Sequence, residues 1–440
     1  MSRCAALFLF VLAPAALSAL AQERPATAAP APRIFCLSRD GLAEAKALVA
    51  RDDPSIRTSF RRLVREADLA LDVGPYSVVL KGPVPPSGNK HDYHSLSPYH
   101  WPDPEQPGGR PYKNRDGFTN PEWWQDYDRV PLERLVQATE TLALAYTFTG
   151  REPYATRAAH LVRIWFLDPA TAMTPDLVYA QAIPGTRPGH TQVIDTRFLP
   201  RLIDAVGLIG ASPAWTPQDQ AALIAWFREF LANVRRRADE GYRNSAHNIA
   251  SFYHAQMAAM ALFVGDEAQA REMIERTKPR LDKAVGPDGF FTVERRRTRS
   301  LSYSCFHLYA LFNLATMGRL LEIDVWNFTT PDGRGLRRAL DAVARHAGPY
   351  PPKDWPFSET GRTPGDWWDP FHDQLPSVLY HAARTYREQS YADLLPRLLG
   401  DSASVDQNRL HLLCGLPLPG QQSLDGWLFH PSPASVGPGK

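Results

Sequence analysis

A cluster of arginines followed by a tyrosine is the chemically most distinctive stretch of the chain. Residues 294–304 read ERRRTRSLSYS, so four arginines (Arg295, Arg296, Arg297 and Arg299) lie within five residues, and Tyr303 follows where a helix is expected to begin. Arginine is always charged and forms paired hydrogen bonds with carboxylates. A nearby positive charge would lower the pKa of the Tyr303 phenol from about 10. The stretch predicts a carboxylate-binding site beside a proton-exchanging tyrosine; a solvated basic helix start with a packing tyrosine is the alternative.

A second group of polar residues opens the helix expected over 245–264. If the whole segment is helical, Asn244, His247, Asn248 and Ser251 share one face, because they are spaced i, i+3, i+4 and i+7. A helix N-terminus favours an anion, and amide and imidazole donors there could hold a carboxylate. The alternative is that Asn244 caps the helix and the histidine is an ordinary core residue.

A third group lies in a long segment without helical periodicity, residues 82–128. Three histidines, two tyrosines and a tryptophan fall within residues 91–101: His91, Tyr93, His94, Tyr99, His100 and Trp101. Loops of this length are usually functional or disordered, and this composition is too aromatic for disorder. We expect one wall of a sugar-binding cleft here; aromatic side chains packed onto the core are the alternative. His91 and His94 lack a further ligand at metal-motif spacing, so we predict no metal and no other cofactor.

These side-chain types together fit β-elimination from a uronic acid polymer. The reaction requires the C5 carboxylate to be neutralised, a base for the C5 proton, and an acid for the leaving glycosidic oxygen. Asparagine, histidine and arginine can do the first, and tyrosine or histidine the other two.

Composition and the first residues of the chain limit the remaining possibilities. Of the 440 residues, Lys+Arg 49 nearly balance Asp+Glu 47, which gives no electrostatic footprint for nucleic acid. Residues 1–21 read as a signal peptide, with Arg3, an apolar run and the cleavage pattern Ala19-Leu20-Ala21. We therefore expect an exported protein, periplasmic or secreted, that is not inserted in a membrane after signal removal. Cys36, Cys305 and Cys414 then remain. Three cysteines allow at most one disulfide, and no C-x-x-C pair among them suggests a zinc site.

Almost all periodic segments are helical, and they must position these groups. Apolar spacing and capping residues predict helices over 40–50, 54–70, 131–149, 153–166, 196–209, 217–235, 245–264, 267–284, 299–320, 335–346, 373–386 and 389–399. Residues 76–80 are the best strand candidate. A dozen helices with short turns and no consensus repeat predict an all-α protein, an (α/α)n toroid or incomplete barrel of helical hairpins, in one domain over 22–440 with a flexible tail at 430–440. We expect the long segments 82–128 and 170–195 to form the cleft.

The sequence resembles the alginate lyase family of α/α-toroid polysaccharide lyases. The resemblance rests on KHDYHSLSPYHWPDP (90–104), NPEWW (120–124), YAQAIPG (179–185), IDTR (194–197) and ERRRTRSLSYS (294–304). It implies cleavage of an acidic polysaccharide of alginate, poly-mannuronate or glucuronan type, with Tyr303 as catalytic acid and often also base. It further implies that Asn248 and Arg297 neutralise the carboxylate. Arg297 matches the family's Glu-x-x-Arg pattern from Glu294, and Arg296 is the spacing alternative. Sugar would be bound by residues of the flanking segments: His94, Tyr99, Trp101, Gln181 and Arg299.

One position departs from the family. Alignment on Tyr253 and Gln256 places Ile249 where the family has a histidine, so His247 would substitute from two residues earlier, as a neutraliser or second base. Within a helix, that shift turns a side chain by about 200°. His94 is an alternative base, acting on the other face of the sugar. Two other functions stay open: a glycoside hydrolase using carboxylates such as Asp92, Asp103, Glu122 or Asp126, and a non-catalytic polyuronate-binding protein.

Overall fold

The computed structural model describes residues 33–187, 192–346, 357–358 and 374–395, all within one compact unit, residues 32–440. Among these residues the helices are α1 (Arg39–Ala50), α2 (Pro54–Ala70), α3 (Arg129–Thr149), α4 (Glu152–Phe166), α5 (Leu199–Ile209), α6 (Pro217–Tyr242), α7 (Asn248–Val264), α8 (Glu267–Glu275), α9 (Thr277–Ala284), α10 (Ser300–Leu320), α11 (Leu336–Ala344), α12 (Gln374–Tyr386) and α13 (Gln389–Ala392). The predicted signal peptide, the tail and Cys414 lie outside the described residues.

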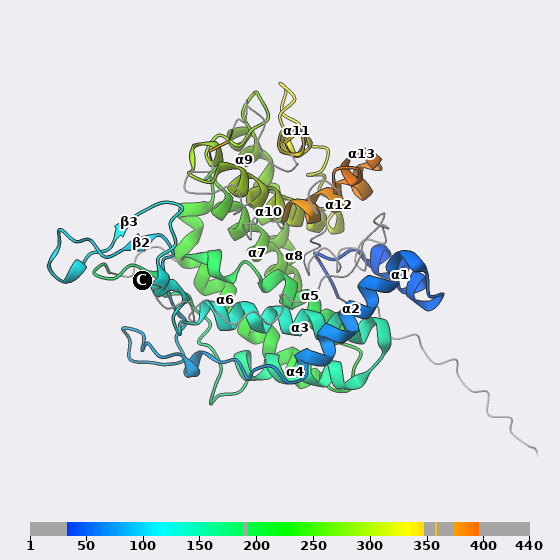
Figure 1. The fold of residues 1–440 in the computed structure, drawn as a ribbon, viewed down its shortest axis with the longest axis horizontal. Coiled ribbons are helices and arrows are strands. Elements are labelled where there is room, and N and C mark those ends of the chain that lie inside the picture. The colour runs from blue at the N-terminus through cyan, green and yellow to red at the C-terminus, as the bar shows by residue number, and fades with distance from the viewer. Residues whose placement is uncertain (1–32, 188–191, 347–356, 359–373, 396–440) are drawn as a thin grey trace, which may run out of the picture. The chain divides into compact units, whose positions relative to one another are not determined.

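The helices pack in two sets. Helices α2, α3, α5, α7, α10 and α12 form a series in which each packs against the next, and α4, α6, α8 and α11 each pack against members of that series (Figure 1). Nearly every residue of α7 and most residues of α10 are buried, which explains why neither helix has a polar face. This arrangement confirms the predicted all-α class and α/α toroid.

Local sequence signals explain where several helices begin and end. At the start of α6, Thr216 and Asp219 form a reciprocal capping box, and α3 ends at Gly150 in the left-handed conformation. The single helix predicted over 267–284 is instead two helices, α8 and α9, that meet at Arg276. None of the helices in the described part of the chain is both long enough and apolar enough to cross a membrane.

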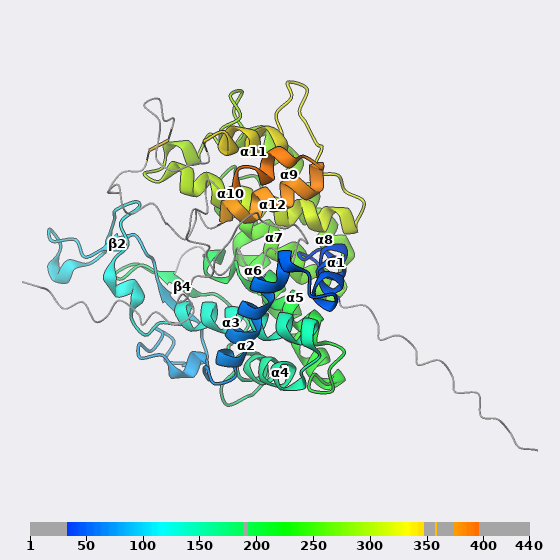
Figure 2. The same ribbon diagram turned by 45° about the vertical axis from the view of Figure 1, so that its right-hand side comes forward.

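Four short strands organise the segments expected to form a cleft. Strand β1 (His94–Leu96) pairs in parallel with β4 (Tyr179–Ala182), and β2 (His100–Trp101) pairs antiparallel with β3 (Lys113–Asn114). The β1–β4 pair places the two long irregular segments side by side (Figure 2). The prediction of a strand at 76–80 was wrong: residues Val78–Leu80 form the 3-10 helix η1, which begins where the Ser77 hydroxyl accepts a hydrogen bond from the Val79 amide.

A buried ion pair fixes the start of the first of these segments. The Lys81 ammonium lies 3.0 Å from Asp128 Oδ2, and both side chains are fully buried. Lys81 also donates to the carbonyl oxygens of Val78 and Lys90, while Asp128 accepts the His94 amide proton at 2.7 Å. Because Asp128 precedes α3, these bonds tie the loop that leads to Tyr99 to the helical framework.

Candidate active site

Two tyrosines from distant parts of the chain meet at the start of α10. The Tyr303 hydroxyl, in the first turn of α10, donates a hydrogen bond of 2.7 Å to the hydroxyl of Tyr99, which lies between β1 and β2. Tyr303 packs in one cluster with Phe252, Phe306 and Ala310, against which Tyr99 also packs. The cluster joins α7, α10 and the loop between β1 and β2, so the fold itself brings the two phenols together.

Arg297 covers the ring of Tyr303. Its guanidinium carbon lies 3.8 Å from the Tyr303 ring centroid, and its Nε and Nη2 atoms donate to the two carboxylate oxygens of Asp116 at 3.0 and 2.5 Å. Asp116 reaches this position because its loop lies against Thr298. Gly117 has φ +80°, and a Cβ there would be only 2.4 Å from the Thr298 hydroxyl oxygen, so no other residue type fits without a shift.

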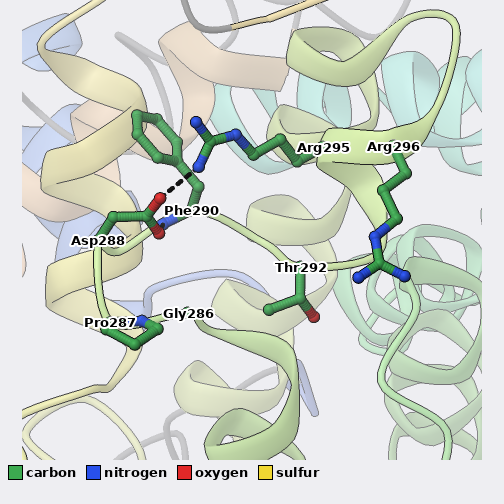
Figure 3. Close-up of a pocket in the computed structure, with 7 residues that line it drawn as sticks. All are labelled: Gly286, Pro287, Asp288, Phe290, Thr292, Arg295 and Arg296. Atoms are coloured by element: carbon green, nitrogen blue, oxygen red, sulfur yellow. Dashed lines mark hydrogen bonds and ion pairs between the residues drawn. The ribbon is translucent and has the colours of Figure 1, made fainter.

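The geometry separates Arg297 from its spacing alternative. Arg296 is exposed and lines a pocket with Asp288 and Arg295 (Figure 3). In that pocket, Arg295 pairs with Asp288 and stacks on Phe290, 4.9 Å from the ring centroid. Since neither tyrosine lines the pocket, Arg297 is the arginine of this cluster that accompanies Tyr303.

The expected direction of the Tyr303 pKa shift was wrong. Burial of the phenol and the neighbouring Tyr99 raise the pKa of Tyr303 well above its ordinary value, and the opposing effect of Arg297 is smaller. The reason is that an ionised phenolate loses more solvation in this enclosed position than one guanidinium restores. Tyr303 is therefore a neutral phenol at neutral pH and suits the role of a proton donor.

Asn248 is held by a buried glutamate. The Glu294 carboxylate accepts from the Asn248 backbone amide at 2.7 Å and from its side-chain Nδ2 at 2.9 Å, and both residues are almost fully buried. The other Glu294 oxygen lies 3.4 Å from His307 Nδ1, while His307 Nε2 is 2.7 Å from the Ser251 hydroxyl. Thus the glutamate three residues before Arg297 orients the asparagine at the start of α7.

His247 lies just outside the helix. With φ −88° and ψ 165° it is extended and precedes the first helical residue of α7. The predicted common helix face with Asn244 was therefore wrong, and His247 is not rotated by about 200° from position 249 as it would be within a helix. Asn244 lies in the turn before it and does not cap α7. Burial lowers the pKa of His247 to about 4, opposed in part by Glu294, so the imidazole is neutral at pH 7. Ile249 packs against the hydrophobic core.

His94 and Gln181 lie farther along the wall formed by β1 and β4. The His94 imidazole is buried, makes edge contacts with Tyr127 and Tyr179, and burial lowers its pKa to about 4. None of its described contacts joins it to Tyr303. Gln181 adopts the left-handed conformation with φ +49°, which is unusual for a residue with a side chain. Its Nε2 donates to Asp195 at 2.8 Å, leaving the amide oxygen of Gln181 as an acceptor.

The other predicted sugar-binding residues border the same segments. Trp101 donates from its indole to the Phe118 carbonyl at 2.9 Å, and the Arg115 guanidinium lies 4.8 Å above its ring. Arg299 is half-buried and forms the N-cap of α10. Trp101 thus lies two residues after Tyr99, in β2, and Arg299 lies one helical turn before Tyr303.

The carboxylates considered for a hydrolase either bind polar groups of their own loops or are exposed. Asp92 accepts from Ser87 and Asn89, Glu122 accepts from Tyr112, and Asp103 accepts from the Glu105 amide, so each is held within its own loop. Asp126 is exposed.

The part of the chain that the structure describes contains no group of three or more histidine, cysteine, aspartate or glutamate side chains that could hold a metal ion. Cys36 is a half-buried free thiol, and Cys305 is buried in α10.

Several residues of the site were not found from the sequence. Asp116, which pairs with Arg297, lies far away in the chain. His307, which contacts Glu294, lies one helical turn after Tyr303 on α10. No sequence motif marks either residue. Asp195 is fully buried and accepts from Tyr93, Ser95 and Gln181. Asp195 belongs to the IDTR stretch, and its place in that motif was the one sequence feature that could have marked it as part of the site.

Comparisons with known proteins show which family and which folds the chain resembles. The family model described as alginate lyase matches residues 77–355. The fold is similar to the crystal structure of an alginate lyase from Bacteroides ovatus, with 31% sequence identity, a TM-score of 0.80, and coverage of 87% of this chain and 99% of that one. It is also similar to two variants of alginate lyase A1-III from Sphingomonas species A1, each complexed with a tetrasaccharide. The tyrosine-to-phenylalanine variant has 15% identity and a TM-score of 0.56, covering 86% of this chain and 95% of that one. The histidine-to-alanine variant has 14% identity and a TM-score of 0.54, covering 83% and 98%. No curated protein sequence matches significantly.

Proposed function

Because the chain belongs to the alginate lyase family, we propose that it is an exported enzyme that cleaves β-linked uronic acid polymers by metal-independent β-elimination. The chain is a polysaccharide lyase; the polymer, the steps of the reaction and the compartment are what we propose. The observation that carries the proposal is that the Tyr303 hydroxyl donates to Tyr99 while the Arg297 guanidinium lies over the Tyr303 ring.

Arg297 and Asn248 would neutralise the C5 carboxylate. Asp116 takes Nε and one Nη2 hydrogen of Arg297, so Nη1 and the second Nη2 hydrogen would bind the substrate carboxylate. The Asn248 amide gives one hydrogen to Glu294, the residue that begins the same turn as Arg297, and would give its second to the substrate. Neutralising the carboxylate makes the C5 proton removable, because negative charge then develops on an oxygen that already has hydrogen-bond donors. A guanidinium and an amide can supply this charge stabilisation, which is why no metal ion is required in this scheme.

Proton transfer would be shared between His247 and Tyr303. The lowered pKa of His247, about 4, keeps the imidazole neutral and able to accept the C5 proton. The raised pKa of Tyr303 keeps its phenol protonated and able to donate to the leaving glycosidic oxygen. The bond between C4 and that oxygen breaks as the C4–C5 double bond forms, so one product begins with a 4,5-unsaturated uronate. Tyr99, Trp101 and Gln181 would bind the sugars, with Arg299 and the β1 residue His94 supporting the two walls.

The substrates are proposed to be alginate, poly-mannuronate or glucuronan. The structures of alginate lyase A1-III with a tetrasaccharide support binding of an oligosaccharide in this fold. Export to the periplasm or the medium rests on residues 1–21, and cell fractionation of the full chain beside a variant lacking those residues tests it.

Digestion of each polymer in ¹⁸O-labelled water tests the reaction type. β-Elimination adds no water, so we expect unlabelled products carrying a C4–C5 double bond, and the same rate after treatment with a chelator. Saturated products with one ¹⁸O atom at the new reducing end would instead establish hydrolysis, and a rate abolished by the chelator would overturn metal independence.

A further inference from the structure

Arg197, in the turn after the 3-10 helix η4 (Val193–Thr196), is a half-buried cation that forms no ion pair with a carboxylate in the part of the chain that the structure describes. Its Nη1 donates to the Ile194 carbonyl at 3.1 Å, and its Nε is shielded from solvent with no hydrogen-bond partner among the described residues. Its guanidinium carbon lies 3.8 Å from the Phe198 ring centroid, so the ring supports the planar group from one side. A charge in this position costs solvation energy, and an opposite charge would recover it.

The two acids near Arg197 are already engaged. The Asp195 carboxylate accepts from the side chains of Tyr93, Ser95 and Gln181, and Glu133 pairs with Arg129 at 3.2 Å. No ion pair joins Arg197 to either acid among the described residues. Burial, and next the like charge of Arg129, lower the pKa of Arg197 to about 10, which still leaves it charged at neutral pH.

The position of Arg197 connects it to the catalytic tyrosine. Its guanidinium carbon lies 5.7 Å from the ring centroid of Phe306, which follows Tyr303 by three residues on α10. Phe306 and Tyr303 belong to one buried cluster, and Ile194, whose carbonyl binds Arg197, packs against that cluster. Three residues of α-helix span about 4.5 Å along the axis, so the guanidinium lies beside the turn of α10 that follows Tyr303.

We propose that Arg197 binds the carboxylate of a uronate unit adjacent to the one cleaved at Tyr303. The inference rests on the proposed function and deepens it, because it makes this subsite selective for a charged sugar. A neutral sugar at this subsite would leave the guanidinium without a counter-charge, whereas a uronate would offer a carboxylate oxygen to the Nη2 end of the group, away from the buried Nε. The enzyme would thereby require a second carboxylate in the polymer, besides the one that β-elimination itself needs.

Binding measurements in the Tyr303→Phe background test the inference without turnover. Calorimetry would compare polyuronate with the same polymer after its carboxyl groups have been reduced to alcohols. Since a hydrogen bond to a charged group contributes about 1.5–3 kcal/mol, Arg197→Gln should weaken polyuronate binding about 10- to 100-fold. Binding of the reduced polymer should stay unchanged. Arg236→Gln, at an exposed arginine of α6 that contacts Asn233, is the matched control and should leave both affinities unchanged.

Two results would overturn the inference. Equal polyuronate binding with and without Arg197→Gln would show that no carboxylate is bound there, and equal losses for both polymers would show that Arg197 only supports packing. If Arg197→Gln does not fold, Arg197→Lys keeps the charge but removes the planar fork, and unchanged polyuronate binding by that variant would contradict the proposal. A wild-type protein that releases no unsaturated product would refute the lyase mechanism alone, since the binding measurements do not depend on turnover.

Discussion

The Tyr303 hydroxyl donates a 2.7 Å hydrogen bond to the Tyr99 hydroxyl, although the two residues are 204 positions apart in the chain. A donated hydrogen bond stabilises the neutral form of the donor, and Tyr99 is indeed one cause of the raised pKa of Tyr303. Tyr99 therefore has two roles in this account: it fixes the direction of the phenol that donates a proton, and it keeps that phenol protonated.

Replacing Tyr99 by phenylalanine should change the pH dependence as well as the rate. Without the acceptor, the pKa of Tyr303 falls, so the alkaline limb of kcat/KM should move to lower pH, and kcat should fall about tenfold because an orienting hydrogen bond is lost. Steady-state rates across the alkaline range, with wild type in parallel, measure both effects. A lower rate with an unmoved alkaline limb would show that Tyr99 does not affect protonation of Tyr303.

Arg297→Lys should be far from conservative. Lysine keeps a positive charge but cannot pair with both Asp116 oxygens or lie flat on the Tyr303 ring. We expect kcat to fall about 10- to 100-fold, because the C5 carboxylate of the substrate would be neutralised less well as negative charge develops on it in the transition state. Arg296→Lys is the matched control in the same turn, since Arg296 is exposed and lines the separate pocket of Figure 3. A loss of the same size in both variants would contradict the assignment of Arg297.

His247 should titrate far below an ordinary histidine. Its pKa of about 4, against a usual 6.5, means that the imidazole stays neutral to low pH. The folded-state pKa is lowered, so the stability linked to the neutral form is complete above about pH 6.5 and is lost as the pH falls towards 4. Titration by NMR should give a midpoint near 4, and the acidic limb of kcat/KM should not lie at 6.5.

Removing the imidazole tests its role as base. His247→Gln retains a hydrogen-bond donor but cannot accept the C5 proton, so kcat should fall by about 10²- to 10⁴-fold. Nearly full activity of His247→Gln would show that His247 only neutralises the carboxylate and that another group is the base.

The buried pair of Lys81 and Asp128 should matter for stability. Lys81→Met leaves the Asp128 carboxylate buried without its counter-ion, which should cost about 3–5 kcal/mol in the free energy of unfolding. Burial raises the pKa of Asp128 to about 7, with Lys81 opposing, so loss of Lys81 should raise it further. Denaturant unfolding measures the cost. Lys46→Met, at an exposed lysine of α1, should change the free energy of unfolding by less than about 0.5 kcal/mol. An equal, small effect at both positions would show that the buried pair does not hold the loop.

Helix periodicity and capping predicted most of the fold because both depend on neighbouring residues. The capping box of Thr216 and Asp219 and the left-handed Gly150 are local features, and they lie at the start of the helix predicted over 217–235 and at the end of the one predicted over 131–149. The break between α8 and α9 at Arg276 and the extended conformation of His247 were missed, since apolar spacing continues across both positions. The 3-10 helix at Val78–Leu80 was missed because three residues carry no periodicity.

The sequence singles out residues of the candidate site where a motif marks them, but it does not show the contacts that the fold makes between distant segments. Tyr303, Arg297 and Asn248 were proposed from their own segments, and the structure brings Tyr303 and Arg297 into contact and ties Asn248 to the turn that leads to Arg297. The bond from Tyr303 to Tyr99 and the pairing of Arg297 with Asp116 span long distances in the chain. The direction of the Tyr303 pKa shift was wrong for the same reason: a sequence shows the neighbouring arginine but not the burial that outweighs it.

The most direct test of the account is ultraviolet absorbance over time, with purified wild type and Tyr303→Phe acting on alginate, poly-mannuronate and glucuronan. We predict a rise from the conjugated unsaturated uronate with at least one polymer, reduced at least 10³-fold in Tyr303→Phe, while circular dichroism shows that the variant is folded. A rise of equal rate in the folded variant would contradict the central role of Tyr303. Bound polymer without any rise in the wild type would contradict β-elimination itself.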